Sequence, residues 1–453
     1  MSALSRADAP GIGRVFRLAW PMTIKALLLH GATVIDTYLV SPLGETALAA
    51  MGLAAAIAGF ALGAILAFSN AMQIRTAQVS GAGVARSIKS VLAAGLAINF
   101  AIGFIGILFV TLAGRVLIDI LGPSGAVNDL AFGYLGVFAV VILFESLSQC
   151  IAGYLNGRGR TTVPLMGFCL SVPVNVAASV ALIHGLAGLP ALGLIGAAIG
   201  SAIGAAVQFA FVGAHLWRHD RWLASVPGWT DGNFKSAFLR QLRFALPIGA
   251  TFASANFASQ VCALFYAQLD LNSFAALTVI NPWIMVAGTV SMQWAQATGI
   301  VVAQLLGEKR PEQVLDAFLS RAWRAAFVTA AVVSVLYAFV CLSSDWLYRA
   351  LDAQTRQILL GFLPILVVLP FPKGSNAICG NTLRASGDTV YVMHVFVWSQ
   401  WLFRVPATAA AVLWLDLPAT GILSIQLLEE IIKFLPFHRR LWCGDWKRAN
   451  LED

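Results

Sequence analysis

The chain has 453 residues, of which 59% are hydrophobic and 11% charged, whereas soluble globular proteins carry about 25% charged residues. This composition excludes a soluble protein, because each crossing of a bilayer core needs roughly twenty apolar residues and such runs recur along most of the sequence. The net charge of +8 resides on basic residues that stand singly or in pairs between apolar runs, which favours membrane topology as its cause and argues against nucleic acid as a partner.

Apolar runs bounded by charges or by Gly and Pro predict twelve transmembrane helices, so the expected fold is an all-α membrane protein. The first six helices are expected at residues 16–40, 47–74, 90–113, 130–154, 163–184 and 191–217. The other six are expected at residues 242–267, 273–303, 322–343, 358–382, 390–414 and 418–436. The segments that result are an N-terminal cytoplasmic segment 1–15, an N-terminal six-helix lobe 16–217, a basic cytoplasmic linker 218–241, a C-terminal six-helix lobe 242–436 and a cytoplasmic tail 437–453.

The distribution of Lys and Arg predicts the orientation of these helices, since both residue types favour the cytoplasmic side of the membrane in short loops. Of the 29 Lys and Arg, 22 fall in the two termini and in the loops after even-numbered helices, or within three residues of these segments. Only Arg115, Arg349 and Arg356 fall in loops after odd-numbered helices. This asymmetry predicts that both termini are cytoplasmic, in a multi-pass protein of the bacterial inner membrane.

The two halves repeat at an offset of 226 to 228 residues, which predicts two pseudo-symmetric six-helix lobes. With an even number of helices per repeat, the halves insert in the same orientation, and the substrate path is expected between them. The repeated motifs are Leu18-Ala19-Trp20-Pro21 with Phe244-Ala245-Leu246-Pro247, Ala49-Ala50 with Ala275-Ala276, Ala77-Gln78-x-x-Gly81 with Ala303-Gln304-x-x-Gly307, and Leu155-x-x-x-Gly159-x-Thr161 with Leu383-x-x-x-Gly387-x-Thr389.

Several motifs resemble those of the multidrug and toxic compound extrusion (MATE) transporters, and they occur in the order expected for that family. In the first half they are Val34-Ile35-Asp36-Thr37, Leu43-Gly44-x-x-Ala47-Leu48-Ala49-Ala50-x-Gly52-Leu53, Gly153-Tyr154-Leu155-Asn156-Gly157-x-Gly159 and Val174-Asn175-Val176. In the second half they are Ala303-Gln304-Leu305-Leu306-Gly307-x-Lys309-Arg310 and Leu383-Arg384-Ala385-x-Gly387-Asp388-Thr389. The resemblance implies two six-helix lobes enclosing a cavity of alternating access, and export driven by inward flow of protons or sodium ions with no other cofactor.

The sequence also departs from the family pattern at positions that bear on ion coupling. Asp36 matches the acidic residue of the first helix, but Ser179 stands where some members carry a second acid after the fifth-helix Asn175. Members with a cation site in the second half have acids in the seventh and tenth helices. Here residues 253–256 contain no acid and Lys373 lies at or near the tenth-helix position. The resemblance therefore implies that coupling depends on the first half.

Asp36 is the main candidate for ion coupling, with Asn175 beside it, because a charge at the centre of an isolated membrane helix costs about 2.5 to 3.5 kcal/mol on insertion scales. Its side chain must therefore face protein or a wet cavity. In the functional interpretation, Asp36 exchanges the coupling ion as access alternates, with a proton favoured over sodium. In the alternative interpretation, it is a permanently ionised member of a structural polar cluster.

Three basic residues within predicted helices, Lys25, Lys373 and Arg404, give the membrane-embedded set a net charge of +2 together with Asp36. Since a drug-cation exporter would favour the opposite sign, these residues are expected to line the substrate cavity and to neutralise an anionic or zwitterionic substrate. Asn376 follows Lys373 by three residues, so the two side chains are neighbours on a helix surface. The alternative is that Lys25 and Arg404 extend toward an interface and that backbone carbonyls hold Lys373.

Other features predict structure more than chemistry. Pro21 and Pro247 occupy equivalent positions in the two halves and predict kinks that could act as hinges. A stripe of three glycines spaced by four predicts close helix packing, at Gly196, Gly200 and Gly204. Four charged residues are expected near helix ends, on a solvated face or in local ion pairs, namely Glu145, Glu429, Glu430 and Lys433.

The sequence therefore predicts an antiporter that exports amphipathic small molecules as a monomer in contact with membrane lipids. A flippase for lipid-linked precursors, from the same broader superfamily, is the main alternative, since a basic cavity would suit a pyrophosphate headgroup. A membrane-embedded enzyme is disfavoured because the chain contains no HExxH, no paired intramembrane aspartates, no Gly-x-Ser-x-Gly and no His/Cys group with metal spacing. A channel is disfavoured because two unlike halves cannot form a ring-like filter.

Overall fold

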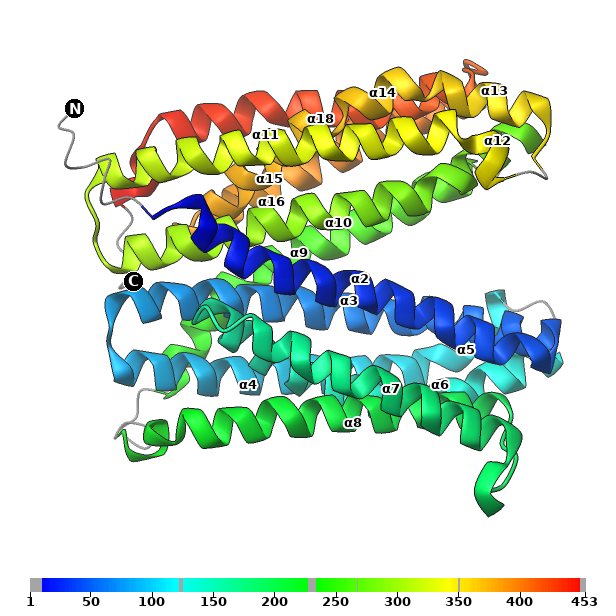
Figure 1. The fold of residues 1–453 in the computed structure, drawn as a ribbon, viewed down its shortest axis with the longest axis horizontal. Coiled ribbons are helices and arrows are strands. Elements are labelled where there is room, and N and C mark those ends of the chain that lie inside the picture. The colour runs from blue at the N-terminus through cyan, green and yellow to red at the C-terminus, as the bar shows by residue number, and fades with distance from the viewer. Residues whose placement is uncertain (1–9, 122–124, 227–233, 267, 349–350, 449–453) are drawn as a thin grey trace. The chain divides into compact units, whose positions relative to one another are not determined.

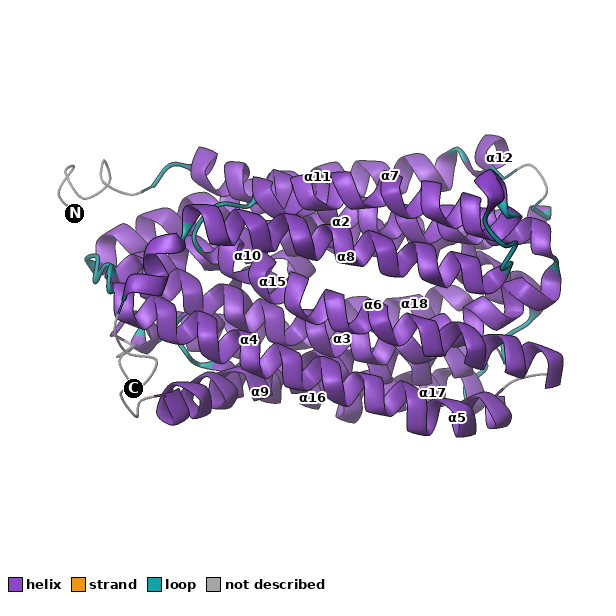
Figure 2. Ribbon diagram, turned by 90° about the horizontal axis from the view of Figure 1, so that it is seen from below, coloured by secondary structure: helices purple, strands orange, loops and turns teal. Residues whose placement is uncertain are grey.

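The computed structural model describes residues 10–121, 125–226, 234–266, 268–348 and 351–448. Within these ranges the regular elements are helices and none is a strand, as Figure 2 shows. The predicted all-α class is therefore confirmed. Arg349, part of the linker and the outermost residues of both predicted terminal segments lie outside the described residues.

The chain divides into two compact units, which we call the first unit (Ile24–Gly249) and the second unit (Met1–Thr23 with Ala250–Asp453). The first unit contains most of α2 (Ile12–Val40) and the first half of α9 (Phe234–Tyr266). Its other α-helices are α3 (Glu45–Ala82), α4 (Ala85–Leu108), the short α5 (Gly114–Leu121), α6 (Gly125–Gly157), α7 (Thr162–His184) and α8 (Leu194–His219). Its short elements are η1 (Ser41–Leu43), the π-helix η2 (Phe109–Ala113), η3 (Leu186–Gly188) and η4 (Arg221–Ser225).

The core of the first unit forms where α3 packs against α4 and α6, and where α8 packs against α6 and α7 (Figure 1). Small side chains allow this packing, since alanines of α3 such as Ala50, Ala54 and Ala58 are fully or almost fully buried. Two apolar clusters result, one around Ile57 and Ile142 and another around Met72 and Tyr154. Close approach of apolar helices thus holds the polar side chains described below in fixed positions.

The second unit contains the second half of α9, two long helices and a series of shorter helical segments between residues 344 and 413. The helices are α10 (Leu271–Gly307), α11 (Glu312–Leu342), α12 (Ser344–Leu347), α13 (Ala353–Gly361), α14 (Leu363–Val368), α15 (Pro370–Ala385), α16 (Thr389–Trp398), the π-helix η5 (Ser399–Arg404), α17 (Val405–Leu413), α18 (Ala419–Trp442) and η6 (Asp445–Arg448). In this unit α15 packs against α10, α11 and α18. The axis of Pro370–Ala385 is bent by 41° from that of the preceding helical segment Ala353–Val368.

Each predicted apolar segment falls on a helix or on consecutive helices, but several predicted boundaries are wrong. One helix was expected to end at residue 74, but α3 continues to Ala82. Another was expected to begin at residue 322, but α11 begins at Glu312. The apolar pattern stops at the edge of the bilayer, whereas the backbone hydrogen bonds of a helix continue beyond it. Arg75 and Lys89, assigned to a loop, therefore lie inside α3 and α4.

Nine helices in the described part of the chain are long and apolar enough to cross a membrane, and the bent pair ending at Ala385 makes a tenth. The two remaining predicted spans do not meet this measure. Their centres are polar, because Ser399, Gln400 and Arg404 interrupt one of them and Glu429, Glu430 and Lys433 interrupt the other. These same residues form a cluster in the folded unit.

The chain passes from one unit to the other inside two helices. In α2 the division falls between Thr23 and Ile24, and in α9 it falls between Gly249 and Ala250. Pro21 and Pro247 each lie within the same turn as the division. Both are buried, and neither can donate a helical hydrogen bond because proline has no backbone N–H.

Candidate functional site

A cavity of about 190 Å³ lies within the first unit, surrounded by α2, α3, α6, α7 and α8. Its wall is apolar on the α3 side, where Leu62 and Ile65 line it. The polar side chains that line it are Thr33 and Asp36 of α2, Glu145 and Gln149 of α6, Ser171 and Asn175 of α7, and Ser201 and Gln208 of α8. The fold thus gathers two carboxyl groups and several neutral hydrogen-bonding groups inside an apolar bundle.

Asp36 and Asn175 are brought together in this cavity. Asp36 is half-buried, and its carboxyl group interacts with the side chain of Asn175. The Oγ atom of Ser179 donates a hydrogen bond of 3.1 Å to Oδ1 of Asn175. Since Oδ1 is engaged by Ser179, the Nδ2 group of Asn175 is the natural donor to the Asp36 carboxylate.

The glycine stripe of α8 positions Asn175 and Ser179 against this cavity. A Cβ atom at Gly204 would lie 2.8 Å from Cβ of Asn175, and one at Gly200 would lie 2.7 Å from the backbone N of Ser179. Contacts this short are possible only because glycine has no side chain. The prediction of close packing at Gly196, Gly200 and Gly204 is confirmed, and its effect is to fix the α7 face that carries Asn175.

Lys25 belongs to a hydrogen-bonded chain at the same cavity, through a neutral amide. Its Nζ donates a hydrogen bond of 2.9 Å to Oε1 of Gln149, and Nε2 of Gln149 donates one of 2.7 Å to Oε2 of Glu145. The expectation that Glu145 lies near a helix end is wrong, because α6 extends from Gly125 to Gly157 and Glu145 faces the cavity. A hydropathy pattern gives helix ends but does not show which helix face meets a cavity.

The cavity also contains a hydrogen-bonding group that has no protein partner among the described residues. Gln208 of α8 is 1% exposed, and its Nε2 group donates to no atom in the described part of the chain. A buried amide without an acceptor costs on the order of 1 to 3 kcal/mol. Gln208 therefore marks a place where a bound water could accept the missing hydrogen bond.

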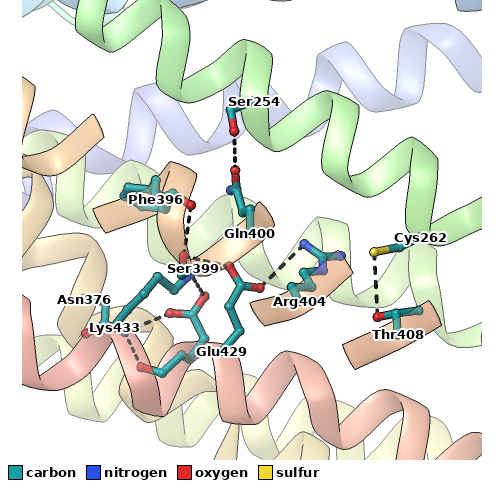
Figure 3. Close-up of polar contacts among 11 residues, drawn as sticks. Ser254, Cys262, Asn376, Phe396, Ser399, Gln400, Arg404, Thr408, Glu429 and Lys433 are labelled. Carbon is teal, nitrogen blue, oxygen red and sulfur yellow. Dashed lines mark hydrogen bonds and ion pairs between the residues drawn. The ribbon is translucent and has the colours of Figure 1, made fainter. Parts of the chain in front are cut away.

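A second set of buried charges lies within the second unit, around the middle of α18. Nζ of Lys433 lies 3.1 Å from Oε1 of Glu429 and 2.8 Å from Oε1 of Glu430. Glu429 also accepts a hydrogen bond of 3.4 Å from Oγ of Ser399. Figure 3 shows Glu429 between Lys433 and Arg404, and an Nη atom of Arg404 lies 3.7 Å from Oε2 of Glu429.

Helix α15 adds two residues to this set, which we call the α18 cluster (Lys373, Arg404, Glu429, Glu430 and Lys433), with Asn376 as its neutral neighbour. Nδ2 of Asn376 donates to the backbone O of Glu430 at 2.7 Å and to its Oε2 at 2.9 Å. Glu430 is also the charge that acts most strongly on Lys373. Asn376 is 2% exposed, so it contacts α18 and not open space.

The expectation that Glu429, Glu430 and Lys433 lie near a helix end is wrong, although local ion pairs between them are confirmed. Helix α18 begins at Ala419 and continues to Trp442, so these residues occupy its middle. Glu429 is 4% exposed and Lys433 is 3% exposed. The predicted end at residue 436 falls at a proline that α18 accommodates within the helix.

The backbone is irregular on both sides of the α18 cluster. Residues Ser399–Arg404 form a π-helix, which places Arg404 about one turn after Ser399 and Gln400, and α15 begins at the bend before Lys373. Insertions of this kind re-aim side chains and occur often at functional sites. Gln400 is held in turn by Ser254 of α9, whose Oγ donates to Oε1 of Gln400 at 2.7 Å (Figure 3).

The structure therefore sorts the predicted site residues into two groups. Asp36 and Asn175 meet in the first unit, with Lys25 bound to the same cavity through Gln149. Lys373, Asn376 and Arg404 meet around α18 in the second unit. Sequence reasoning missed Glu145, Gln149 and the acids of α18 as members of these groups, although Lys433 at three and four residues from two acids is a visible ion-pair spacing.

A larger hollow of about 510 Å³ in the second unit lies between α11 and the end of α18. Aromatic side chains line much of it, including Trp323, Phe434, His438 and Trp442. It contains none of the predicted site residues. Among the described residues, no group of three or more His, Cys, Asp or Glu could hold a metal ion.

Comparison with known proteins gives a consistent family match. The MatE family model matches residues 21–180 and 247–409, so its two stretches begin at Pro21 and Pro247, in the register of the repeated motifs. A relative from Deinococcus radiodurans, described as a probable multidrug resistance protein NorM, is 27% identical over 442 residues, which cover 93% of this chain and 94% of the relative. Another probable NorM, from Bradyrhizobium diazoefficiens, is 26% identical, covering 90% of this chain and 88% of the relative.

A solved structure shows the same fold. An outward-facing multidrug resistance MATE family transporter of the MOP superfamily matches with a TM-score of 0.81, covering 95% of this chain and 96% of the other. The sequence identity in that match is 19%, so the likeness concerns the arrangement of helices.

Proposed function

The chain belongs to the MatE family of transporters, and on this premise we propose that it is an ion-coupled secondary antiporter that exports amphipathic small molecules by alternating access between two six-helix lobes. Membership in this family makes it a multi-pass membrane transporter and not an enzyme. The resemblance between its motifs and those of MATE proteins is thereby confirmed. The finer proposal comprises twelve membrane passages, lobes at 16–217 and 242–436 joined by the linker 218–241, and cytoplasmic termini in a bacterial inner membrane.

The observation that supports ion coupling is the cavity that contains Asp36 and Asn175. Two carboxyl groups line this cavity, those of Asp36 and Glu145. One ammonium group, that of Lys25, is connected to Glu145 by hydrogen bonds through Gln149. Lys25 offsets the charge of Glu145, so one negative charge is left uncompensated on Asp36. A single monovalent cation balances that charge.

The composition of the cavity favours a proton over sodium as this cation. Protonation needs one carboxyl oxygen, whereas a sodium ion needs several oxygen ligands at once. Ser179, which stands where some family members have a second acid, points its hydroxyl at Asn175. The site therefore has one free carboxylate, a chemistry that suits proton exchange.

The substrate is proposed to contact basic groups that the sequence analysis identified, namely Lys25, Lys373, Asn376 and Arg404. The structure narrows this proposal, because Lys25 and Asn376 are hydrogen-bonded to protein partners. Lys373 and Arg404 are then the residues best placed for a direct role. Pro21 and Pro247 are proposed as hinges, since the chain passes between the units beside each of them.

Transport in inverted membrane vesicles tests the function. We expect export of amphipathic compounds to be driven by an imposed proton gradient and to persist without sodium. Export driven only by a sodium gradient would replace the proton with sodium in the proposal. No transport of small molecules under either gradient, with transport of a lipid-linked pyrophosphate, would favour the flippase alternative instead.

A further inference from the structure

The α18 cluster has an excess of positive charge. It contains three basic side chains, Lys373, Arg404 and Lys433, and two acidic ones, Glu429 and Glu430. Both carboxylates are engaged by Lys433, and Glu429 also faces Arg404. With all five groups ionised the net charge is +1, inside a unit whose surrounding core is apolar. A buried excess charge is costly unless a group of opposite sign compensates it.

Donor groups in the cluster are also left without acceptors. Among the described residues, Nζ of Lys373 makes no hydrogen bond or ion pair, and Nε of Arg404 is buried without an acceptor. Lys373 comes from α15 and Arg404 from the π-helix η5. The charge of Arg404 acts electrostatically on Lys373. Both the charge excess and the unpaired donors point to an acceptor of negative charge that the protein does not itself supply.

The neighbour of the Lys373 ammonium group on α10 is a residue without a side chain. The ammonium group lies beside Gly288 of α10, where an added Cβ atom would be 3.5 Å from Nζ. Glycine at this position keeps the α10 side of the ammonium group free of a side chain. Lys373 is half-buried, whereas Asn376 one turn later is buried against Glu430.

We propose that Lys373, assisted by Arg404, binds one monovalent anionic group. When no anion is bound, the carboxylate of Glu430 partly compensates the positive charge of Lys373. This proposal rests on the proposed transport function and names its substrate class, amphipathic molecules that bear a carboxylate or a similar anion. A free inorganic anion such as chloride has the same chemistry. The excess charge of the α18 cluster is opposite in sign to that of the Asp36 cavity, so coupling cation and substrate anion have separate sites.

The role of Glu430 gives the proposal an unusual signature. Because Glu430 and a bound anion compete for the same positive field, removing the charge of Glu430 strengthens anion binding. Removing the charge of Lys373 weakens anion binding. A purely structural cluster behaves differently, since breaking a buried ion-pair network from either side destabilises the same fold.

The test uses the full chain in lipid nanodiscs and equilibrium dialysis with two probes of the same ring system, 2-naphthoate and 2-naphthylmethylammonium. For the wild type we expect tighter binding of the naphthoate. Lys373→Gln should weaken naphthoate binding by at least about tenfold, because an ammonium in a low-dielectric site contributes a few kcal/mol. Lys373→Arg should retain most of the affinity, and Glu430→Gln should increase it. Elution profile and melting temperature of each variant check that the protein is folded.

Chloride added at constant ionic strength distinguishes the two ligand sources. Competition with naphthoate in the wild type would assign the site to any small anion, and absence of competition would assign it to organic carboxylates. The proposal is overturned if Lys373→Gln and Glu430→Gln weaken both probes alike, or if folded Lys373→Gln binds naphthoate as the wild type does.

Asp36→Asn separates this proposal from the proposed function. We expect it to abolish ion coupling and to leave naphthoate affinity within about twofold, since the two sites share no partner. Absence of naphthoate selectivity in the wild type, with intact coupled transport, would contradict the substrate class alone. Intact selectivity without any coupled transport in the wild type would contradict the antiporter alone.

Discussion

Ser179 on α7 donates a 3.1 Å hydrogen bond from Oγ to Oδ1 of Asn175, one turn earlier on the same helix. This bond occupies Oδ1 and leaves the Nδ2 group of Asn175 as the donor available to Asp36, whose carboxyl group interacts with the Asn175 side chain. The Asp36 carboxylate is therefore held by a neutral donor, and it remains free to exchange a cation.

Asp36→Asn should abolish ion-coupled export and leave the protein in the membrane, because an amide cannot exchange a proton or hold a cation by charge. Asp388→Asn is the control, since Asp388 accepts a 2.8 Å hydrogen bond from Arg440 outside the cavity and its loss should be milder. Vesicle transport under an imposed gradient measures both. Normal coupled export by Asp36→Asn would show that Asp36 is structural.

Ser179→Asp should add sodium binding to the cavity. The new carboxylate would lie beside Asn175, so two acids could contribute oxygen ligands to one cation. We expect sodium to raise the melting temperature of Ser179→Asp and to leave that of the wild type unchanged. Ser179→Asn, which is similar in size and neutral, is the matched control. Sodium stabilisation of the wild type would instead favour sodium as the native coupling ion.

Lys25→Met should lower the free energy of unfolding by on the order of 3 kcal/mol, because it leaves the buried Glu145 without its compensating charge. Glu145→Gln should also destabilise the protein by leaving Lys25 unpaired. The double variant should recover most of the loss, since the amide of Gln149 bridges both groups. Thermal unfolding of the four proteins forms a double-mutant cycle, and additive losses would refute the coupling of Lys25 to Glu145.

Labelling of single cysteines tests the orientation of the chain. Cysteines at Arg86, Arg221 and Arg310 should react with impermeant reagents only from the cytoplasm, and cysteines at Glu45 or Gly188 only from the outside. All five positions are exposed, so accessibility depends on the side of the membrane. Labelling of the cysteine at Arg221 from the periplasm would refute the twelve-helix scheme.

Pro21→Ala and Pro247→Ala should each slow export several-fold and leave substrate affinity unchanged. Alanine restores a backbone donor and straightens the helix beside the division between units, which stiffens the proposed hinge. Pro282→Ala on α10 is the control, because this proline also lies inside a helix but away from either division. Equal effects of all three variants would indicate general helix destabilisation.

The sequence by itself determined the membrane class, the approximate position of each helix, the repeat and the family. All of these follow from local patterns: apolar runs of bilayer length, basic residues between them, and motifs in a constant register. Asp36 was identifiable for the same reason, since an acid inside an apolar run is visible without knowledge of its partners.

Only the tertiary structure decided which charges meet. Glu145, Glu429 and Glu430 are compensated by Lys25, Arg404 and Lys433, and two of these pairings, Lys25 with Glu145 and Arg404 with Glu429, depend on packing between separate helices. A buried charge is tolerated when a partner from another helix offsets its desolvation, and hydropathy measured along one segment contains no information about that partner. The predicted placement of these acids near helix ends was wrong for this reason, and only the fold shows that Lys373 and Asn376 of α15 lie beside the charges of α18.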